Sequence, residues 1–174
     1  MNTLDAMKER RSCRNFKSDM PTKQQLETIC EAGSYAATGM GRQSPIIIAV
    51  TNKELRDRIS AMNAKIMGKE DGFDPFYGAP AMLIVLADKN IPTHVYDGSL
   101  VMGNLMLAAH ELGLASCWIH RAREEFESEE GKEILRSLGI EGEYEGIGHC
   151  AVGFAADAPA PAAKRKDSYI TFAE

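Results

Sequence analysis

The sequence predicts an α+β fold in which a mixed β-sheet of four or five strands is flanked by helices. The chain opens with polar, helix-favouring segments, its middle alternates short apolar runs with amphipathic stretches, and it ends in an extended tail. With 174 residues, of which 44% are hydrophobic and 26% charged, it can bury a core without disulfides or a metal. We therefore expect a single domain over residues 1–174.

Helical periodicity and capping residues predict five helices. They lie at residues 2–11, 22–38, 53–67, 97–112 and 124–138. Short runs rich in apolar and β-branched residues predict four strands. They lie at residues 46–51, 82–87, 115–119 and 147–154.

Three further stretches of the chain also predict local structure. Residues 68–80, rich in Gly, Asp, Pro and aromatic side chains, predict a loop that can act as a lid. The many glutamates of residues 124–145 are best explained as a solvent-exposed face. Residues 155–163 are too rich in Ala and Pro to pack as a helix, and they lead to a last β-prone stretch at 169–172.

The helix at residues 97–112 has almost no polar face, so protein must cover it on all sides, in a core or at a subunit interface. The C-terminal tail is too long and apolar to remain unpacked, and it would be buried by crossing onto a partner subunit. Both features favour a homodimer in which the C-terminal tail is exchanged between subunits.

Composition excludes several classes of protein. The net charge of -5 argues against nonspecific binding to nucleic acid or to anionic membranes, and no stretch approaches the ~20 apolar residues of a membrane span. The start of the chain has no apolar signal core. The four cysteines and four histidines are scattered without metal-ligand spacing. We expect a cytoplasmic protein with no structural metal.

Positive charge is nevertheless concentrated at the two ends of this acidic chain. The residues concerned are Lys8, Arg10, Arg11, Arg14 and Lys17, with Ser12 among them, and then Lys164, Arg165 and Lys166. Arginine forks and a serine hydroxyl suit the oxygens of a phosphate monoester. On composition alone, a solvated basic helix end that complements the helix dipole is the better explanation of the first group.

The full string Arg10-Arg11-Ser12-Cys13-Arg14-Asn15-Phe16, after a short helix, resembles the opening motif of the FMN-dependent nitroreductase family. The resemblance continues, in the family's order, over nearly the whole chain. Residues 36–45 are similar to the family's second flavin loop, residues 77–80 to its Gly-Ala-Pro segment, residues 104–118 to its central helix and following strand, and residues 164–166 to its closing basic element.

The resemblance implies a nitroreductase-like three-layer fold with one FMN at each subunit junction. Arg10, Arg11 and Ser12 would bind the phosphate and ribityl chain, Lys164, Arg165 or Lys166 would complete the phosphate site, and Arg14 would lie at the pyrimidine edge of the ring. The other subunit would contribute Gln43, Ser44, Pro45 and Ile46. Trp118, Ile119 and His120 would line the far side of the ring, where backbone N–H groups could bond flavin N5 and O4.

The chain departs from the family pattern in the loop at residues 41–45, where Gly41 replaces an asparagine and Ser44-Pro45 replaces Pro-Trp. His120-Arg121 likewise replaces a pair that usually contains glycine. These departures leave the range of substrates open.

Several isolated residues could carry chemistry. Cys117 on its strand could be a nucleophile but is better explained as a buried core thiol, and Cys13 could have a redox role within the basic motif. His149 is best explained as a core histidine. The pair Gly39-x-Gly41 is no dinucleotide fingerprint because it precedes a strand.

We therefore expect an FMN-dependent NAD(P)H oxidoreductase that reduces nitroaromatics, quinones or related small acceptors by two-step hydride exchange through flavin N5. NADH or NADPH would visit the flavin transiently, and no side chain is expected to act as an essential acid or base. Two alternatives stay open: a flavin-binding protein of the same fold with a sensor, storage or non-reductive role, and a phosphate-ligand binding domain without flavin.

Overall fold

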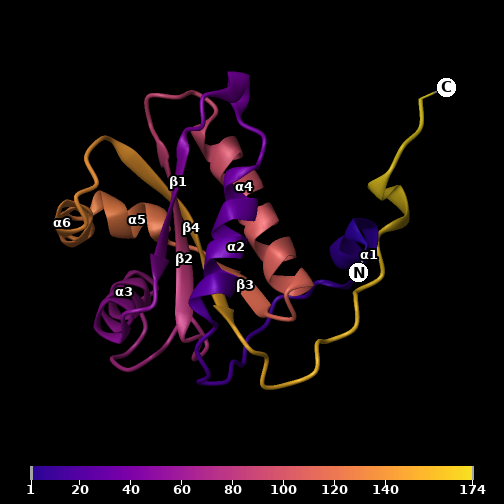
Figure 1. Ribbon diagram of the computed structural model, residues 1–174, viewed down its shortest axis with the longest axis horizontal. Coiled ribbons are helices and arrows are strands. Elements are labelled where there is room, and N and C mark those ends of the chain that lie inside the picture. The colour runs from indigo at the N-terminus through magenta and orange to yellow at the C-terminus, as the bar shows by residue number, and fades with distance from the viewer. Residues whose placement is uncertain (1, 174) are drawn as a thin grey trace.

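The computed structural model describes residues 2–173 and has an antiparallel sheet between two layers of helices (Figure 1). The strands are β1 (Pro45–Val50), β2 (Ala81–Asp88), β3 (Ala115–Ile119) and β4 (Tyr144–Gly153), in the spatial order β1-β2-β4-β3. All four predicted strands are therefore confirmed. The expected α+β fold, with helices on both faces of one sheet, is also confirmed.

The expectation of a mixed sheet is wrong for the pairing of the described strands, because all three strand pairs are antiparallel. Strands β2 and β3 both run antiparallel to β4 and so run parallel to each other, as strands joined by a helix often do. Strand β4 separates them, so they exchange no hydrogen bonds. The sequence shows that strands alternate with helices, but it does not show that the last strand, β4, lies between β2 and β3.

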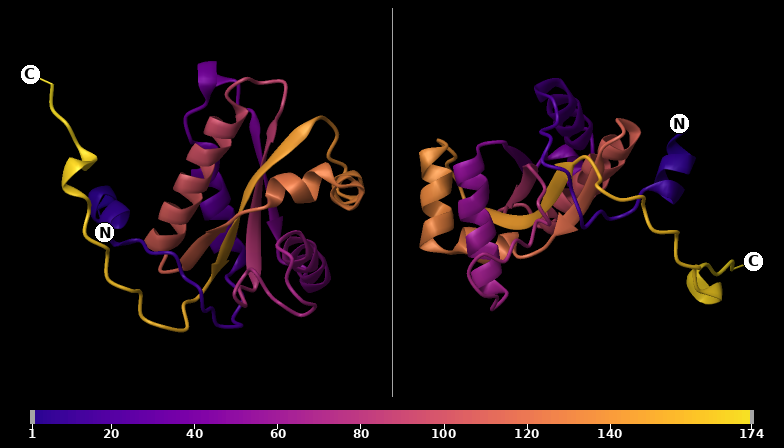
Figure 2. Two further views of the ribbon diagram at one scale, coloured as in Figure 1. Left: turned by 180° about the vertical axis from the view of Figure 1, so that it is seen from behind. Right: turned by 90° about the horizontal axis from the view of Figure 1, so that it is seen from below.

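The two faces of the sheet carry separate cores. Helices α2 (Lys23–Ser34) and α4 (His94–Glu111) cover one face, and α3 (Lys53–Ile66), α5 (Ala122–Glu127) and α6 (Glu129–Ser137) cover the other (Figure 1). Strand β2 is buried along nearly its whole length because it lies between both cores. The short helix α1 (Thr3–Glu9) stands apart from these layers, beside the C-terminal tail (Figure 2).

The predicted capping residues are confirmed at both early helices. Asn2 accepts a hydrogen bond from the backbone of Asp5 at the start of α1. Thr22 and Gln25 form a reciprocal capping box at the start of α2. Helix α2 ends at Ser34, four residues earlier than expected, and residues 39–41 form a separate 3-10 turn.

The single helix expected at residues 124–138 is wrong, because the chain breaks at Ser128 into α5 and α6. Ser128 is extended, with φ -71° and ψ 157°, and its hydroxyl accepts a hydrogen bond from the backbone of Gly131. A side chain at position 131 would start 2.1 Å from the Glu125 carbonyl oxygen, so only glycine permits so tight a turn between the helices.

The expectation that the acidic segment is wholly a solvent-exposed face is also wrong at one position. Glu125 is fully buried, and its Oε2 lies 2.6 Å from Nε2 of the equally buried His149 on β4. The neighbouring Glu124 and Glu127 instead make ion pairs at the surface. His149 is, as expected, a core residue with partners, since Nδ1 also lies 3.4 Å from the Ile119 carbonyl oxygen.

The loop expected to act as a lid is fixed along its second half. Asp74 accepts hydrogen bonds from the Arg56 guanidinium, the Ser60 hydroxyl and the backbone of Phe76 and Gly78. Arg56 also donates to the Ala79 carbonyl oxygen. Residues 74–79 are therefore part of the frame of the protein.

The C-terminal tail makes no strand within the described chain. Residues 156–173 run extended and exposed along one side of the molecule, with a short 3-10 turn at Asp167–Tyr169 (Figures 1 and 2). Tyr169, Ile170 and Phe172, the residues expected to be β-prone, are each more than two-thirds exposed. No described helix is long and apolar enough to cross a membrane.

Candidate functional site: a cationic cleft at the edge of the sheet

The basic motif at residues 10–16 lies along the outer edge of β3. The Cys13 backbone N–H donates to the Ser116 carbonyl oxygen at 2.9 Å, and Ser12 forms a parallel bridge with Ser116. Strand β3 is the last strand of the described sheet, so its outer edge is free to receive this segment. The edge of the sheet thus fixes the position of the motif.

The start of the C-terminal tail is attached to the same segment. The Lys17 backbone N–H donates to the Phe154 carbonyl oxygen at 2.8 Å, and the Ala156 N–H donates to the Asn15 carbonyl oxygen at 2.9 Å. The Asn15 side chain donates to Asp157 at 2.6 Å. These contacts lead the tail past α1, so the two basic ends of the chain lie side by side.

A cleft of about 690 Å³ opens between α1, the motif and the tail; we call it the cationic cleft. It is lined by Met7, Lys8, Arg10, Arg11, Ser12, Arg14, Ala160, Ala162, Ala163 and Arg165. Five of these side chains are cationic and none is acidic. Such an arrangement repels itself unless an anion occupies it.

Arg10 and Arg11 differ in the hydrogen bonds that their guanidinium groups already make within the chain. The Arg11 guanidinium donates to the Lys8 and Arg10 carbonyl oxygens, both at 2.6 Å, and so caps the C-terminal end of α1. In contrast, Nη1 of Arg10 is buried and has no hydrogen-bond partner among residues 2–173. A buried, unpaired guanidinium nitrogen is costly, and an anionic ligand would satisfy it.

Of the basic triplet in the tail, only Arg165 lines the cationic cleft. Lys164 pairs with Asp167 at 3.4 Å, and Lys166 lies over the Tyr169 ring, 5.6 Å from its centroid. The described chain therefore favours Arg165 as the tail residue of the predicted phosphate site.

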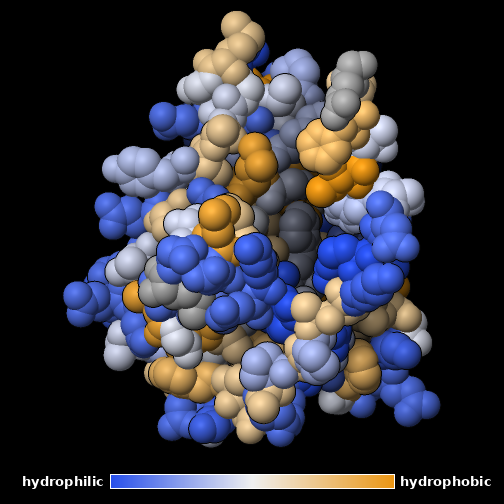
Figure 3. Space-filling model, turned by 90° about the vertical axis from the view of Figure 1, so that its right-hand side faces the viewer, coloured by the Kyte–Doolittle hydropathy of each residue, from blue (hydrophilic) through white to orange (hydrophobic). Residues whose placement is uncertain are grey.

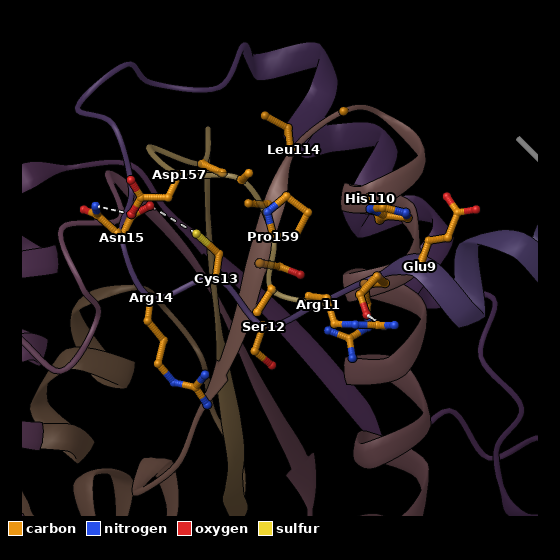
Figure 4. A pocket seen from close by; sticks show the side chains of 17 residues that line it. Glu9, Arg11, Ser12, Cys13, Arg14, Asn15, His110, Leu114, Asp157 and Pro159 are labelled. Carbon is orange, nitrogen blue, oxygen red and sulfur yellow. Dashed lines mark hydrogen bonds between the residues drawn. The ribbon is translucent and has the colours of Figure 1, made fainter. Parts of the chain in front are cut away.

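A second cleft, of about 550 Å³, lies on the other side of the motif (Figure 4). In this view Asn15 and Asp157 lie at one end of the cleft and His110, from the end of α4, lies at the other, with Cys13 and Pro159 between them. The Arg14 side chain points away from this cleft (Figure 4). Its lining is mostly apolar, so the cationic cleft is the better site for a charged ligand.

Trp118, Ile119 and His120 lie at the far end of β3 and line a pocket of about 250 Å³ with Phe73, Tyr77 and four other residues. The Trp118 indole packs on Gly148, where a side chain would start 2.2 Å from the indole nitrogen. Asn63 donates to the His120 carbonyl oxygen at 2.8 Å. The backbone that the sequence assigns to the flavin ring is thus held by buried neighbours.

Gln43, Ser44, Pro45 and Ile46 lie elsewhere, in the loop before β1 and at the start of that strand. They line neither of the clefts beside the motif. The Ser44 hydroxyl donates to the buried carboxylate of Asp97 on α4, at 2.7 Å. Within one chain, the structure therefore does not bring these four residues to the basic motif.

Sequence reasoning missed Asp97 and Glu125 as site-building residues. A carboxylate at the start of a largely apolar helix was a signal for Asp97, because burial of an acid requires partners. Glu125 gave no signal, since it stands among other glutamates of the same appearance.

The cysteines are all free in the structure. Cys117 and Trp118 face opposite cores, as strand alternation predicts, and burial raises the pKa of the Cys117 thiol. Burial also raises the pKa of Cys150, to about 12. Both thiols remain protonated at neutral pH, so the interpretation of Cys117 as a core thiol is supported. Residues 2–173 contain no group of three or more His, Cys, Asp or Glu side chains placed to hold a metal ion.

The fold and the cleft define a three-layer α+β protein with a cationic cleft at the edge of its sheet. The model of the nitroreductase family matches residues 7–154. The chain belongs to the nitroreductase family, which confirms the resemblance found in its motifs.

Known relatives extend this result. An FMN-bound nitroreductase from Bacteroides fragilis is 30% identical, with a TM-score of 0.89, and one from Desulfitobacterium hafniense is 33% identical, with a TM-score of 0.88. Each alignment covers 100% of both chains. A protein of Methanothermobacter thermautotrophicus, provisionally named NADH dehydrogenase/NAD(P)H nitroreductase, is 27% identical over 122 residues, which span 68% of this chain and 60% of that relative.

Proposed function

We propose that the protein is an FMN-dependent NAD(P)H oxidoreductase that reduces small acceptors such as nitroaromatics or quinones. The observation that carries the proposal is the cationic cleft, which is lined by cations from the two ends of the chain, among them Arg10 with its buried Nη1 unpaired within residues 2–173. Family membership and the FMN in two solved relatives support the same assignment.

The residues present fit a phosphorylated flavin. Arg10, Ser12 and Arg165 line the cleft and suit a phosphate, with Arg11 held beside them. From the Ser12–Ser116 bridge, β3 continues for three residues to Ile119, about 10 Å at the usual strand rise. A ligand with its phosphate in the cleft would therefore extend along the edge of the sheet and place its ring near Trp118 and His120.

When bound, FMN would supply the transfer of hydride and electrons from NADH or NADPH to a small acceptor. The contribution of the chain is position and charge. The Arg14 guanidinium would stand at the pyrimidine edge of the ring, where a fixed cation stabilises negative charge. No side chain is assigned as an essential acid or base.

We also propose that the protein is a homodimer, and the length of α4 supports this. Helix α4 has 18 residues and is about 27 Å long. His110 at its end borders the motif, whereas Asp97 near its start holds the loop of Gln43. Asp97 and His110 are 13 positions apart, about 20 Å along the helix, so one chain holds the two regions well apart. Two copies with antiparallel α4 helices would place the loop of one beside the cleft of the other.

The exposed face of α4 is suited to such contact. Tyr96 and Leu100 are 73% and 52% exposed, and at Gly103, the middle of the helix, an added side chain would meet nothing within 4 Å. On this side of the molecule, apolar patches lie beside a group of hydrophilic side chains (Figure 3). We propose that the helices cross at Gly103 and that the tail, with its exposed Tyr169 and Phe172, packs on the partner.

The test is to purify the protein, record its visible spectrum, and identify the released chromophore after denaturation. We expect FMN, and oxidation of NADH or NADPH that depends on an added nitroaromatic or quinone. Tight FMN binding without turnover would favour the sensor or storage alternative. A colourless protein that ignores added FMN but binds inorganic phosphate would favour the phosphate-ligand domain and refute the proposal.

A further inference from the structure

The loop between α2 and β1 has a strained backbone. Met40, Gly41 and Gln43 have φ values of 56°, 67° and 50°, in the left-handed region that residues with side chains rarely adopt. All three are exposed, and Met40 is 88% exposed. Strained residues that point outward do not serve the packing of their own chain, and they often mark functional loops.

A buried carboxylate binds both ends of this loop, in addition to the bond from the Gln43 backbone N–H to the Thr38 hydroxyl. Asp97 is 2% exposed, and its Oδ1 accepts a hydrogen bond from the Gly39 backbone N–H at 2.9 Å. Its Oδ2 accepts from the Ser44 hydroxyl at 2.7 Å and from the Thr93 hydroxyl at 3.1 Å. The two ends of the strained segment, Gly39 and Ser44, are thus fastened to the same side chain.

The surroundings of Asp97 are built for this contact. A side chain at position 39 would start 2.3 Å from the Thr93 hydroxyl oxygen, so glycine is required for the loop to approach α4. Burial alone would raise the pKa of Asp97, but the hydrogen bonds from Ser44, Gly39 and Thr93 outweigh it and the pKa is lowered. The group therefore remains a charged acceptor at neutral pH.

We propose that Asp97 is a positioning residue for the flavin site: it fixes the loop so that Gln43 and Met40 project toward the ring bound by the partner subunit. This inference rests on the proposed function. It changes the assignment of Ser44, because the buried Ser44 hydroxyl donates its proton to Asp97 and cannot also donate to a flavin. Gln43 is then the polar side chain of the loop that reaches the ring.

Two variants test the clamp. Asp97→Asn keeps the shape of the side chain but cannot accept from all three donors, and Ser44→Ala removes one donor without touching Asp97. Asp19→Asn is the control, because it makes the same change of charge at an exposed position in the segment before α2.

The first measurement needs no flavin. Arg42 is exposed within the clamped segment, so trypsin cleavage after Arg42 in the FMN-free protein reports how often the loop opens. We expect cleavage to be about tenfold faster in Asp97→Asn, since a charge-assisted contact is lost, and less accelerated in Ser44→Ala. The control should be cleaved at the wild-type rate.

The second measurement is the FMN dissociation constant, taken together with the melting temperature. We expect the constant to rise about tenfold in Asp97→Asn and to stay within about twofold in the control. If Asp97→Asn melts at a lower temperature but binds FMN as the wild type does, Asp97 only stabilises the fold and the proposal is wrong. Unchanged trypsin cleavage would also overturn it.

The failure of this proposal can be told from the failure of the proposed function. If the wild-type protein binds no FMN, the function fails and the assignment of Asp97 to a flavin site fails with it. If the wild type binds FMN and both variants behave as the control does, the function stands and the role of Asp97 is refuted.

Discussion

A negative charge at the proposed crossing point of the α4 helices should separate the subunits without unfolding them. Position 103 is the place to introduce it, because in a single chain an added side chain there meets nothing within 4 Å. Gly103→Ala should even stabilise an isolated chain by about 0.5–1 kcal/mol, since glycine is unfavourable inside a helix. Any loss caused by Gly103→Glu would therefore arise from contact between two copies.

The expected effect is large because the symmetry doubles it. In a two-fold dimer, Gly103→Glu would place one carboxylate from each subunit in the contact between the helices. If burial costs about 3 kcal/mol per unpaired ion, the dimer loses about 6 kcal/mol, or about 10⁴-fold in its dissociation constant.

The assay is the molar mass in solution by light scattering over a broad range of protein concentration, with the bound flavin measured in the same samples. We expect monomeric Gly103→Glu with little flavin and with helical circular dichroism like that of the wild type. Gln24→Glu adds the same charge to the exposed surface of α2 and should remain dimeric. A Gly103→Glu protein that stays dimeric and yellow would refute the proposed crossing of α4.

Three further outcomes follow from the site and the frame. Arg10→Ala should weaken FMN binding by roughly 1.5–3 kcal/mol in a fluorescence titration and Arg11→Ala by less, because only Arg10 has an unpaired nitrogen; equal losses would contradict this order. Burial would raise the pKa of Asp74, but its hydrogen bonds lower it, so its stabilisation is present above about pH 4 and lost as the pH falls through the folded-state pKa. Asp74→Asn should therefore unfold more easily at neutral pH, by roughly 1–2 kcal/mol in urea, and show a weaker dependence on acid; an unchanged acid transition would count against it. Alkylation of the native protein at about pH 8 should modify the half-buried Cys13 and spare Cys150, whose pKa is raised to about 12, as peptide mass spectrometry would show; early labelling of Cys150 would contradict its burial.

Local signals in the sequence predicted most elements of the fold. The helix cap at Thr22, the β-branched run before Val50 and the apolar run of β2 are short-range patterns, and each is confirmed. The break at Ser128 was missed because the stretch around it also fits one amphipathic helix. The turn there depends on the close approach of Gly131 to Glu125, which no local pattern reveals.

The buried polar groups were beyond local patterns for the same reason. Glu125 differs from neighbouring glutamates only in facing His149, and that contact joins residues 24 positions apart in the chain. Asp97 fastens residues that lie more than 50 positions before it. Whether a carboxylate is solvated or buried is decided by what packs on it, so sequence alone gives at best a suspicion.

The motifs of the candidate site were all visible in the sequence. Their order along the chain did not predict that the basic motif and the loop of Gln43 lie apart in space. Both the basic motif and the loop of Gln43 precede α4 in the sequence, and the resemblance assigns both to one flavin. The structure places them toward opposite ends of that helix, with His110 near one and Asp97 near the other. The 13 positions from Asp97 to His110 span about 20 Å of a rigid helix, which does not shorten to bring the two regions together. If both regions serve one ligand, a second copy must supply one of them. The assignment of both regions to one flavin and the homodimer are therefore one hypothesis, and a result that refutes either refutes both.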